Sequence, residues 1–312
     1  MTSILSRVEQ ARAGCAEYRA GGTDLQQRLA SGVAAGPVVD LHDLSELKGI
    51  AWDGQGRARI GALTPIAALA GDAKLVAAYP ALARSAAALA TPQIRSMATL
   101  GGNLLQRSRC WYFRNAAIPC LKKGGENCPA REGNHFLGVC FDLGGCVAPH
   151  PSTLGMALLA YEAYFETADG SMRPLAALHG DGSDARRDHQ LGERQLLTAI
   201  IMPAPVDGER AAYCRAISRA AAEWPLAEAV VRLTTSAAGN ISFARVAVGG
   251  VAPVPLRRER VEHAMVGRPA NGDTLRSAAA YAADGATPLP MTGYKPGLLR
   301  ATVLEALEHA LQ

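Results

Sequence analysis

Cysteine is the residue type whose spacing in this sequence points most directly to chemistry. Five of the seven cysteines lie between Cys110 and Cys146, whereas Cys15 and Cys214 stand apart. Glycine and proline are frequent among the five, which predicts a long loop with little regular structure. Thiolates gathered in such a loop suit a zinc ion or an iron–sulfur cluster. A disulfide framework is not expected, because a chain of 312 residues builds a core without one.

The spacing alone leaves three interpretations of these cysteines open: an iron–sulfur cluster, a zinc ion, or thiols that bind no metal. Zinc sites usually contain pairs of ligands about two to four residues apart. The nearest two cysteines here, Cys140 and Cys146, are separated by five residues, which favours the cluster. The spacing does not select which four of the five cysteines would be ligands. His135 and His150 flank the cysteines and are interpreted as structural.

Two glycine turns, Gly21-Gly22 and Gly101-Gly102, form the second candidate site. The first precedes Thr23 and Asp24, either of which is a suitable N-cap for a helix beginning at residue 25. Glycine lets the backbone approach an anion closely, so both turns are candidates to bind a diphosphate through backbone N–H groups. Each turn by itself is more often an ordinary structural turn. The three spaced glycines of a Rossmann dinucleotide site are absent from the sequence.

Composition and charge exclude several classes of protein. The net charge is only +4 and the basic residues are spread along the chain, unlike those of a nucleic-acid-binding protein. No apolar run approaches the roughly 18 residues that a membrane span requires. The first seven residues become polar too quickly for a signal peptide. A cytoplasmic protein is therefore expected, or a periplasmic one if a partner carries the export signal.

The elements expected around the candidate sites are helices mixed with antiparallel strands, which indicates the α+β class. A polar segment at 179–193 is expected to be a surface loop near a domain boundary. The predicted helices cover 7–18, 25–30, much of 65–90, 154–159, 259–266, 274–284 and 298–311. The predicted strands cover 37–41, 50–52, 58–62, 161–167, 197–202, 211–217 and 241–248, while 226–233 reads as either type.

The order of these motifs resembles the FAD-binding medium subunit of the xanthine dehydrogenase, or molybdenum hydroxylase, family. Residues 20–25 and 91–104 are similar to the two FAD loops of that family. Three further segments resemble segments of that family in their residue types and in their order along the chain: 60–64, 196–200 and 247–253. The resemblance covers nearly the whole chain.

Within that family, residues 106–114 and 120–128 resemble a [4Fe–4S] insertion. This insertion is found in one branch, which includes the medium subunits of aldehyde oxidoreductase and 4-hydroxybenzoyl-CoA reductase. The resemblance places the fourth ligand four residues before His150, at Cys146, and leaves Cys140 as a spare thiol. The implied ligands are Cys110, Cys120, Cys128 and Cys146.

The resemblance also implies the fold and the flavin contacts. The implied fold is a PCMH-type FAD-binding fold of two subdomains, 1–54 and 55–185, with the iron–sulfur insertion at about 106–146, followed by an α+β domain at 190–312. Thr153 stands where relatives usually carry an aspartate that contacts FAD. The implied flavin contacts are Ala20, Gly21, Gly22, Thr23, Asp24, Leu25, Thr99, Gly101, Gly102, Asn103, Leu197 and Arg219.

The function implied is that of an electron-transfer subunit of an oxidoreductase complex, in which no side chain of this chain acts on the organic substrate. The partners implied are a large subunit with a molybdenum cofactor and a small subunit with [2Fe–2S] clusters. A stand-alone FAD oxidoreductase and a non-catalytic scaffold stabilised by zinc are the alternatives. The sequence identifies neither the organic substrate nor the final electron acceptor.

Overall fold

A computed structural model describes residues 6–9, 17–192 and 195–312. Residues 6–9 are helical, and residues 10–16 of the helix predicted at 7–18 lie outside the described residues. That helix does not extend to residue 18, because Glu17–Arg19 forms strand β1. Strand β1 pairs in parallel with β2 (Val38–Asp40), and helix α2 (Leu25–Ala30) connects the two strands. The first glycine turn lies between β1 and α2.

The centre of the molecule is an antiparallel sheet whose strand order is β3-β4-β7-β5-β6. Ile60 of β4 and Phe165 of β5 both pair with Ile200 of β7, so β7 joins two hairpins that lie more than a hundred residues apart in sequence. The predicted domain limits at 54 and 190 fall within this sheet, because β3 precedes the first limit and β7 follows the second. The strands are β3 (Ile50–Trp52), β4 (Ala58–Gly61), β5 (Tyr164–Thr167), β6 (Met172–Pro174) and β7 (Leu197–Met202).

Short helices pack against this sheet, and α3, α4 and α5 among them are rich in alanine. Helix α9 is apolar over its whole length and almost entirely buried, where it contacts α5 and α7. The second glycine turn is the first part of α7 itself. These helices are α3 (Ile66–Gly71), α4 (Ala73–Ala78), α5 (Pro80–Ala87), α6 (Pro92–Met97), α7 (Leu100–Leu104), α9 (Thr153–Ala160) and α10 (Ala176–His179).

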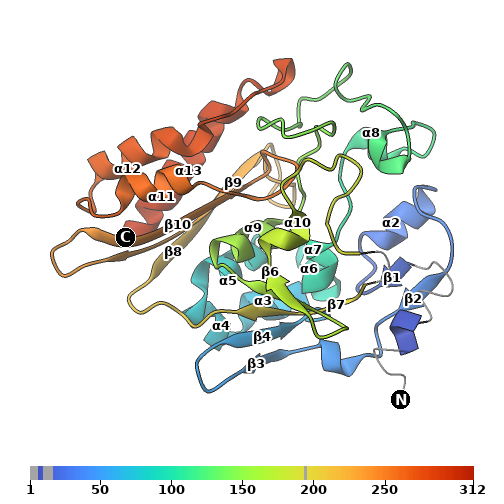
Figure 1. The fold of residues 1–312 in the computed structure, drawn as a ribbon, viewed down its shortest axis with the longest axis horizontal. Coiled ribbons are helices and arrows are strands. Elements are labelled where there is room, and N and C mark those ends of the chain that lie inside the picture. The colour runs from blue at the N-terminus through green and yellow to red at the C-terminus, as the bar shows by residue number, and fades with distance from the viewer. Residues whose placement is uncertain (1–5, 10–16, 193–194) are drawn as a thin grey trace.

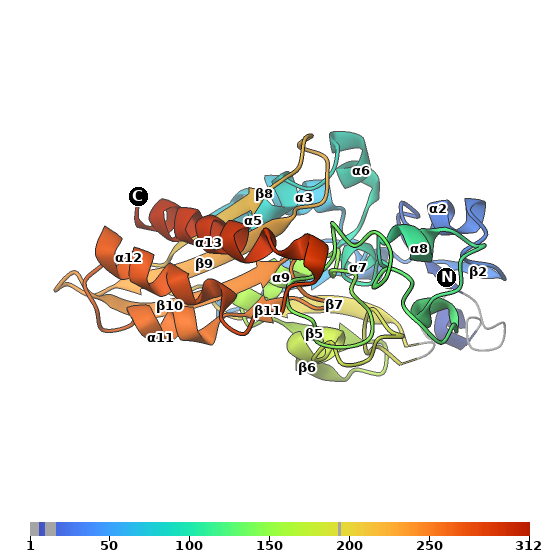
Figure 2. The same ribbon diagram turned by 90° about the horizontal axis from the view of Figure 1, so that it is seen from above.

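The C-terminal part is a second antiparallel sheet, in the order β11-β10-β9-β8, covered on one face by helices (Figures 1 and 2). Its other face packs on α5 and α9, so the two sheets share one hydrophobic core. The segment at 226–233, for which the sequence predicted either a helix or a strand, belongs to a strand. The elements are β8 (Arg210–Ala216), β9 (Ala227–Thr235), β10 (Ile241–Gly249), β11 (Leu256–Arg257), α11 (Glu259–Met265), α12 (Gly272–Ala279) and α13 (Lys295–Leu311).

The cysteine-rich segment between α7 and α9 is a long loop, as predicted from its glycines and prolines. It contains one turn of helix, α8 (Trp111–Arg114), and a 3-10 turn at Leu121–Lys123. Figure 1 shows this green segment beside α2. None of the described helices is long and apolar enough to cross a membrane.

Candidate functional site

The two glycine turns meet at a cavity of about 520 Å³. Leu63, Leu105 and Leu196 provide apolar parts of its wall, and Arg186 and Arg187 provide charged ones. Ten of the twelve flavin contacts implied by the sequence line it, so residues far apart in the chain are brought together here. Those ten are Ala20, Gly21, Gly22, Thr23, Asp24, Leu25, Thr99, Gly101, Gly102 and Leu197.

Only glycine fits at Gly21, where the first turn packs against the backbone just before the second. A Cβ atom added to Gly21 would lie 1.8 Å from the carbonyl oxygen of Met97. The following residue, Gly22, has a φ angle of +73°, in the left-handed region that other residues rarely adopt. The glycine pair is therefore required both for the direct contact between the two loops and for the turn itself.

The residues of the first turn line the cavity, and their backbone N–H groups have no acceptor in the described part of the protein. Within the described residues, the N–H groups of residues 21–25 donate to no protein acceptor, and Gln26 is the first residue after the turn whose N–H does so, to Gly22 at 2.9 Å. Successive N–H groups without protein acceptors, at the wall of a cavity, form a concave donor surface for an anion. This arrangement suits the oxygens of a diphosphate.

The second turn differs, because its N–H groups are already used within the protein. Gly101 donates to the Ala62 carbonyl oxygen at 2.8 Å. Gly102 donates to Oγ1 of Thr99, the N-cap of α7, at 3.1 Å. The second turn therefore offers no free N–H groups at Gly101 and Gly102. Its contribution is that these glycines let the backbone come close to the cavity.

Asn103 and Arg219, the remaining two implied contacts, do not line this cavity. The Asn103 Oδ1 atom accepts a 2.7 Å hydrogen bond from Ser152, whose hydroxyl also caps α9 by accepting from Gly155. Asn103 thus joins the second turn to the start of α9. Arg219 is exposed in the connection between β8 and β9, and its backbone N–H donates to Glu223 at 3.1 Å.

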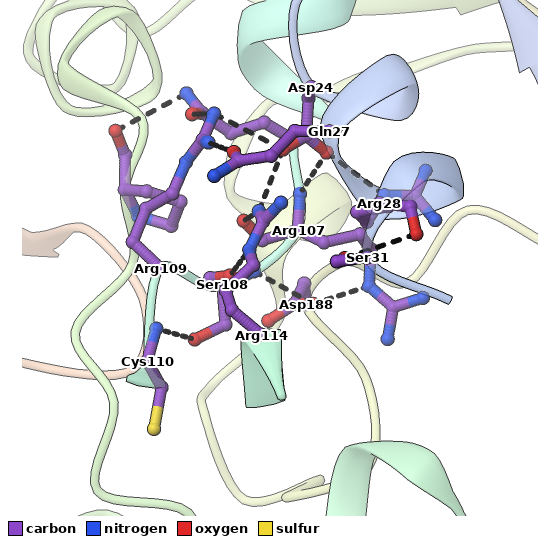
Figure 3. A network of polar contacts seen from close by, with 12 residues as sticks. Asp24, Gln27, Arg28, Ser31, Arg107, Ser108, Arg109, Cys110, Arg114 and Asp188 are labelled. Atoms are coloured by element: carbon purple, nitrogen blue, oxygen red, sulfur yellow. Dashed lines mark hydrogen bonds and ion pairs between the residues drawn. The ribbon is translucent and has the colours of Figure 1, made fainter. Parts of the chain in front are cut away.

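The side chain of Asp24 is turned toward four arginine residues (Figure 3). Its Oδ1 atom lies 2.7 Å from Arg114 Nη2 and 3.2 Å from Arg109 Nη2. Its Oδ2 atom accepts from Arg28 Nε and from the backbone N–H of Arg107, each at 3.2 Å. Burial raises the pKa of Asp24, but the charges of Arg109 and Arg114 outweigh burial, so the carboxyl remains ionised well below its usual pKa.

Asp188 is a cavity residue that the sequence did not reveal. Its carboxylate lies 2.6 Å from Arg107 Nε and 2.9 Å from Lys122 Nζ. Burial raises the pKa of Asp188, but the charges of Lys122 and Arg107 lower it far more. Lys122 follows Cys120 closely, so Asp188 binds the cysteine loop to the cavity wall. Asp188 lies in the polar segment 179–193, which was predicted only as a surface loop, and residue 193 of that segment lies outside the described residues.

Four of the five clustered cysteines lie near enough to influence one another's ionisation. The thiols of Cys128 and Cys146 are hydrogen-bonded, which lowers the pKa of Cys128 and raises that of Cys146. Burial raises the pKa of Cys110, and the charges of Cys128 and Cys120 raise it further. Among these four residues, all within the described part of the chain, no three Sγ atoms lie within 4.8 Å of one another.

Cys140 is separate from these four. It is fully buried in the core of the C-terminal domain. Its backbone N–H donates to Val251 at 2.9 Å, and its carbonyl oxygen accepts from Thr287 at 2.8 Å. Burial raises the pKa of the Cys140 thiol to about 11. Cys140 is therefore a residue of the hydrophobic core of the C-terminal domain.

Thr153 is directed toward the second sheet and does not line the cavity. Its hydroxyl donates to Glu228 Oε1 at 3.2 Å, and Tyr213 donates to Glu228 Oε2 at 2.9 Å. Burial raises the pKa of the Glu228 carboxyl to about 7. Relatives usually carry an aspartate that contacts FAD at the position of Thr153. In this chain Thr153 instead connects α9 to Glu228 of β9.

Two family models match the chain almost from end to end. Residues 3–205 match the FAD binding domain in molybdopterin dehydrogenase. Residues 212–310 match the CO dehydrogenase flavoprotein C-terminal domain. The two matches meet between β7 and β8, where the central sheet ends and the second sheet begins.

Curated relatives agree with these models. The chain is 31% identical over 258 residues to the aldehyde oxidoreductase FAD-binding subunit PaoB of Escherichia coli K12, which covers 79% of this chain and 78% of that protein. It is 29% identical to the carbon monoxide dehydrogenase medium chain of Afipia carboxidovorans, covering 78% of this chain and 69% of the relative.

Solved structures share the fold. A carbon monoxide dehydrogenase from Hydrogenophaga pseudoflava that lacks the Mo-pyranopterin moiety aligns with a TM-score of 0.78 at 23% identity, over 100% of this chain and 95% of that chain. Quinoline 2-oxidoreductase from Pseudomonas putida 86 aligns with a TM-score of 0.78 at 19% identity, with the same coverage.

Proposed function

Because this chain belongs to the family of FAD-binding medium subunits of CO dehydrogenase, xanthine dehydrogenase and aldehyde oxidoreductase, we propose that it binds FAD in the cavity between its two glycine turns. The observation that carries the proposal is the row of backbone N–H groups at residues 21–25 that have no protein acceptor. Bound FAD supplies the exchange between one-electron and two-electron transfer that such a complex needs between [2Fe–2S] clusters and an external acceptor.

The cavity wall supports this assignment chemically. A diphosphate requires several donors at once, and the first turn offers them where Gly21 brings the backbone of Met97 and Ala98 into contact with it. Leu63, Leu105 and Leu197 supply apolar surface for a flavin or adenine ring. The Asp24 carboxylate holds the turn in place by accepting a 2.7 Å hydrogen bond from Arg114.

We further propose that Cys110, Cys120, Cys128 and Cys146 hold a [4Fe–4S] cluster. The separation of Cys140 from these four supports the ligand set. A single tetrahedral zinc ion, with zinc–sulfur bonds of roughly 2.3 Å, would require ligand sulfurs about 3.8 Å apart. Because no three of these described sulfurs lie within 4.8 Å of one another, the geometry favours a larger group with several metal atoms.

The relatives support a place for this chain in a larger assembly. One of them is the medium chain of a carbon monoxide dehydrogenase, and another is the FAD-binding subunit of an aldehyde oxidoreductase. We propose that this chain assembles with a large molybdenum-cofactor subunit, where the organic substrate reacts, and a small [2Fe–2S] subunit. The proposed location is the cytoplasm, or the periplasm if a partner carries the export signal.

Cofactor analysis of the purified complex tests these proposals. We expect one FAD and four iron atoms on this chain, with flavin absorption near about 450 nm and a cluster shoulder near about 400 nm. Cys146→Ser should lose the iron of this chain and retain FAD, whereas Cys140→Ser should retain both. A colourless chain containing zinc, or turnover of an organic substrate by this chain alone, would contradict the proposal. Loss of iron in Cys140→Ser only would show that the ligand assignment is wrong.

A further inference from the structure

We infer that Cys214, Glu305 and His309 form a binding site for one divalent cation of the zinc type. The Cys214 Sγ atom lies 3.2 Å from His309 Nδ1. One ligand atom from each of the three residues lies within 4.8 Å of those of the other two. The site is separate from the cysteine loop and from the cavity between the glycine turns, and it does not depend on the proposed function.

Two elements of the C-terminal domain position these side chains. Helix α13 packs along β8 and β9, and Cys214 lies on β8 beneath it. Glu305 and His309 are four residues apart on α13, so they project from the same face one turn apart. His309 belongs to the last turn of α13, and the C-terminus that follows this turn lies far from α2 in both views (Figures 1 and 2).

The ligand types and their spacing fit a tetrahedral zinc ion. Thiolate, imidazole and carboxylate are the groups that bind zinc in proteins, and three of them leave a fourth position for water. Bonds of about 2.3 Å to sulfur and 2.0–2.1 Å to nitrogen would place those two atoms about 3.6 Å apart. The observed separation of 3.2 Å requires only a small movement. Glu305 and His309 are exposed, so a cation and its water reach the site from solvent.

The charges around the site favour a cation on balance. A thiolate and a carboxylate offset the two positive charges of the ion, and the last turn of α13 adds the negative end of a helix. Arg84 opposes them, because its positive charge also faces Cys214. Without metal, burial and the charge of Glu305 raise the pKa of Cys214 to about 11, so metal binding must release a proton. Binding is therefore expected to weaken as the pH falls.

A cation at this position would fasten the last turn of α13 to β8. Within the described residues, these two elements already meet through a hydrogen bond from Arg210 to the Leu311 carbonyl oxygen at 2.8 Å. A ligand that binds only the folded chain stabilises it. Zinc should therefore raise the temperature at which the C-terminal domain unfolds.

The test is a comparison of zinc content between matched variants of the full-length protein. Each protein is reduced, incubated with Zn²⁺, desalted and analysed for bound zinc. The wild-type protein should retain one equivalent more than Cys214→Ser, whatever the cysteine loop contains. Cys140→Ser is the control, because it removes another buried thiol and should leave that equivalent in place.

Two further variants guard against misfolding of Cys214→Ser. Glu305→Gln and His309→Gln change exposed side chains, so the fold should be retained. We expect each to weaken zinc binding by roughly tenfold or more and to abolish the zinc-dependent shift in unfolding temperature. Equal zinc content in all variants would overturn the inference, as would a wild-type dissociation constant for this equivalent weaker than roughly 10 µM.

Discussion

Asp24 and Arg114 are joined by a 2.7 Å hydrogen bond although ninety residues separate them in the chain. Asp24 ends the first glycine turn, which lines the cavity, and Arg114 belongs to α8, which begins immediately after Cys110. The contact therefore makes the first glycine turn and the first part of the cysteine loop one structural unit. Whatever disturbs one of them is expected to disturb the other.

Asp24→Asn tests this connection. The amide keeps the size of the side chain but removes the charge that three arginine side chains share, and it leaves their guanidinium groups without a buried anion. We expect the free energy of unfolding to fall by about 2–4 kcal/mol. Flavin affinity should fall by roughly tenfold or more. Chemical denaturation and flavin fluorescence measure the two effects.

Asp40→Asn is the matched control. Asp40 also pairs with an arginine, Arg19, on the neighbouring strand, but both side chains are more than a third exposed. Exposed ion pairs contribute at most about 1 kcal/mol, so this variant should be nearly as stable as the wild-type protein and bind flavin normally. Equal behaviour of the two variants would show that Asp24 is an ordinary surface carboxylate.

Gly21→Ala tests the contact between the two glycine loops. The added methyl group would overlap the Met97 carbonyl oxygen, which belongs to the backbone and cannot turn aside. The loops must then separate, at a cost of about 1–3 kcal/mol, and the cavity wall opens. We expect most of the FAD to be lost on gel filtration, measured as the ratio of flavin absorbance to protein absorbance.

Gly54→Ala provides the comparison for this substitution. Gly54 lies in the exposed turn between β3 and β4, and a Cβ atom there meets no atom within 4 Å. The change should alter stability by no more than about 0.5 kcal/mol and leave the flavin content intact. Full retention of FAD by Gly21→Ala would mean that the close approach of the loops is not required.

Features encoded by local sequence were predicted well. The alternation of apolar and polar residues at 241–248 corresponds to β10, and the helical pattern at 298–311 corresponds to α13. Both were predictable because an element that buries one face shows a periodic pattern of apolar residues in its own sequence. The glycine turns and the cysteine loop were found for the same reason: each is marked by residue types within one short segment. Family resemblance then supplied the order in which these segments belong together.

Features that depend on distant partners were not predicted. The polar sequence around Asp188 carries no periodic signal, and its role is apparent only when Arg107 and Lys122 are seen beside it. The same limit applies to β7, whose neighbours in the sheet come from residues thirty or more positions away. The difference between the two glycine turns likewise depends on a distant partner. The N–H group of Gly101 is used within the protein because it donates to the Ala62 carbonyl oxygen, and no local pattern identifies Ala62 as that acceptor.

Glu228 should make the folded protein less stable as the pH rises. Its carboxyl is fully buried, and burial raises the pKa from an ordinary value of 4.5 to about 7. Between these values the unfolded chain releases the proton while the folded chain retains it. The free energy of unfolding therefore falls from pH 4.5 to pH 7, by a total of about 3 kcal/mol from this group, and the loss is complete above pH 7.

Glu228→Gln should remove this part of the pH dependence, because the amide stays neutral and can still bond to Thr153 and Tyr213. The variant should gain stability relative to the wild-type protein between pH 5 and pH 8, as measured by denaturant unfolding at each pH. Glu166→Gln is the control with the opposite sign, because Arg59 holds the pKa of Glu166 below its ordinary value. That variant should lose stability relative to wild type as the pH rises, by less than about 1 kcal/mol for a partly exposed pair. A Glu228→Gln protein whose stability follows the wild-type pH profile would show that Glu228 is ionised in the folded state.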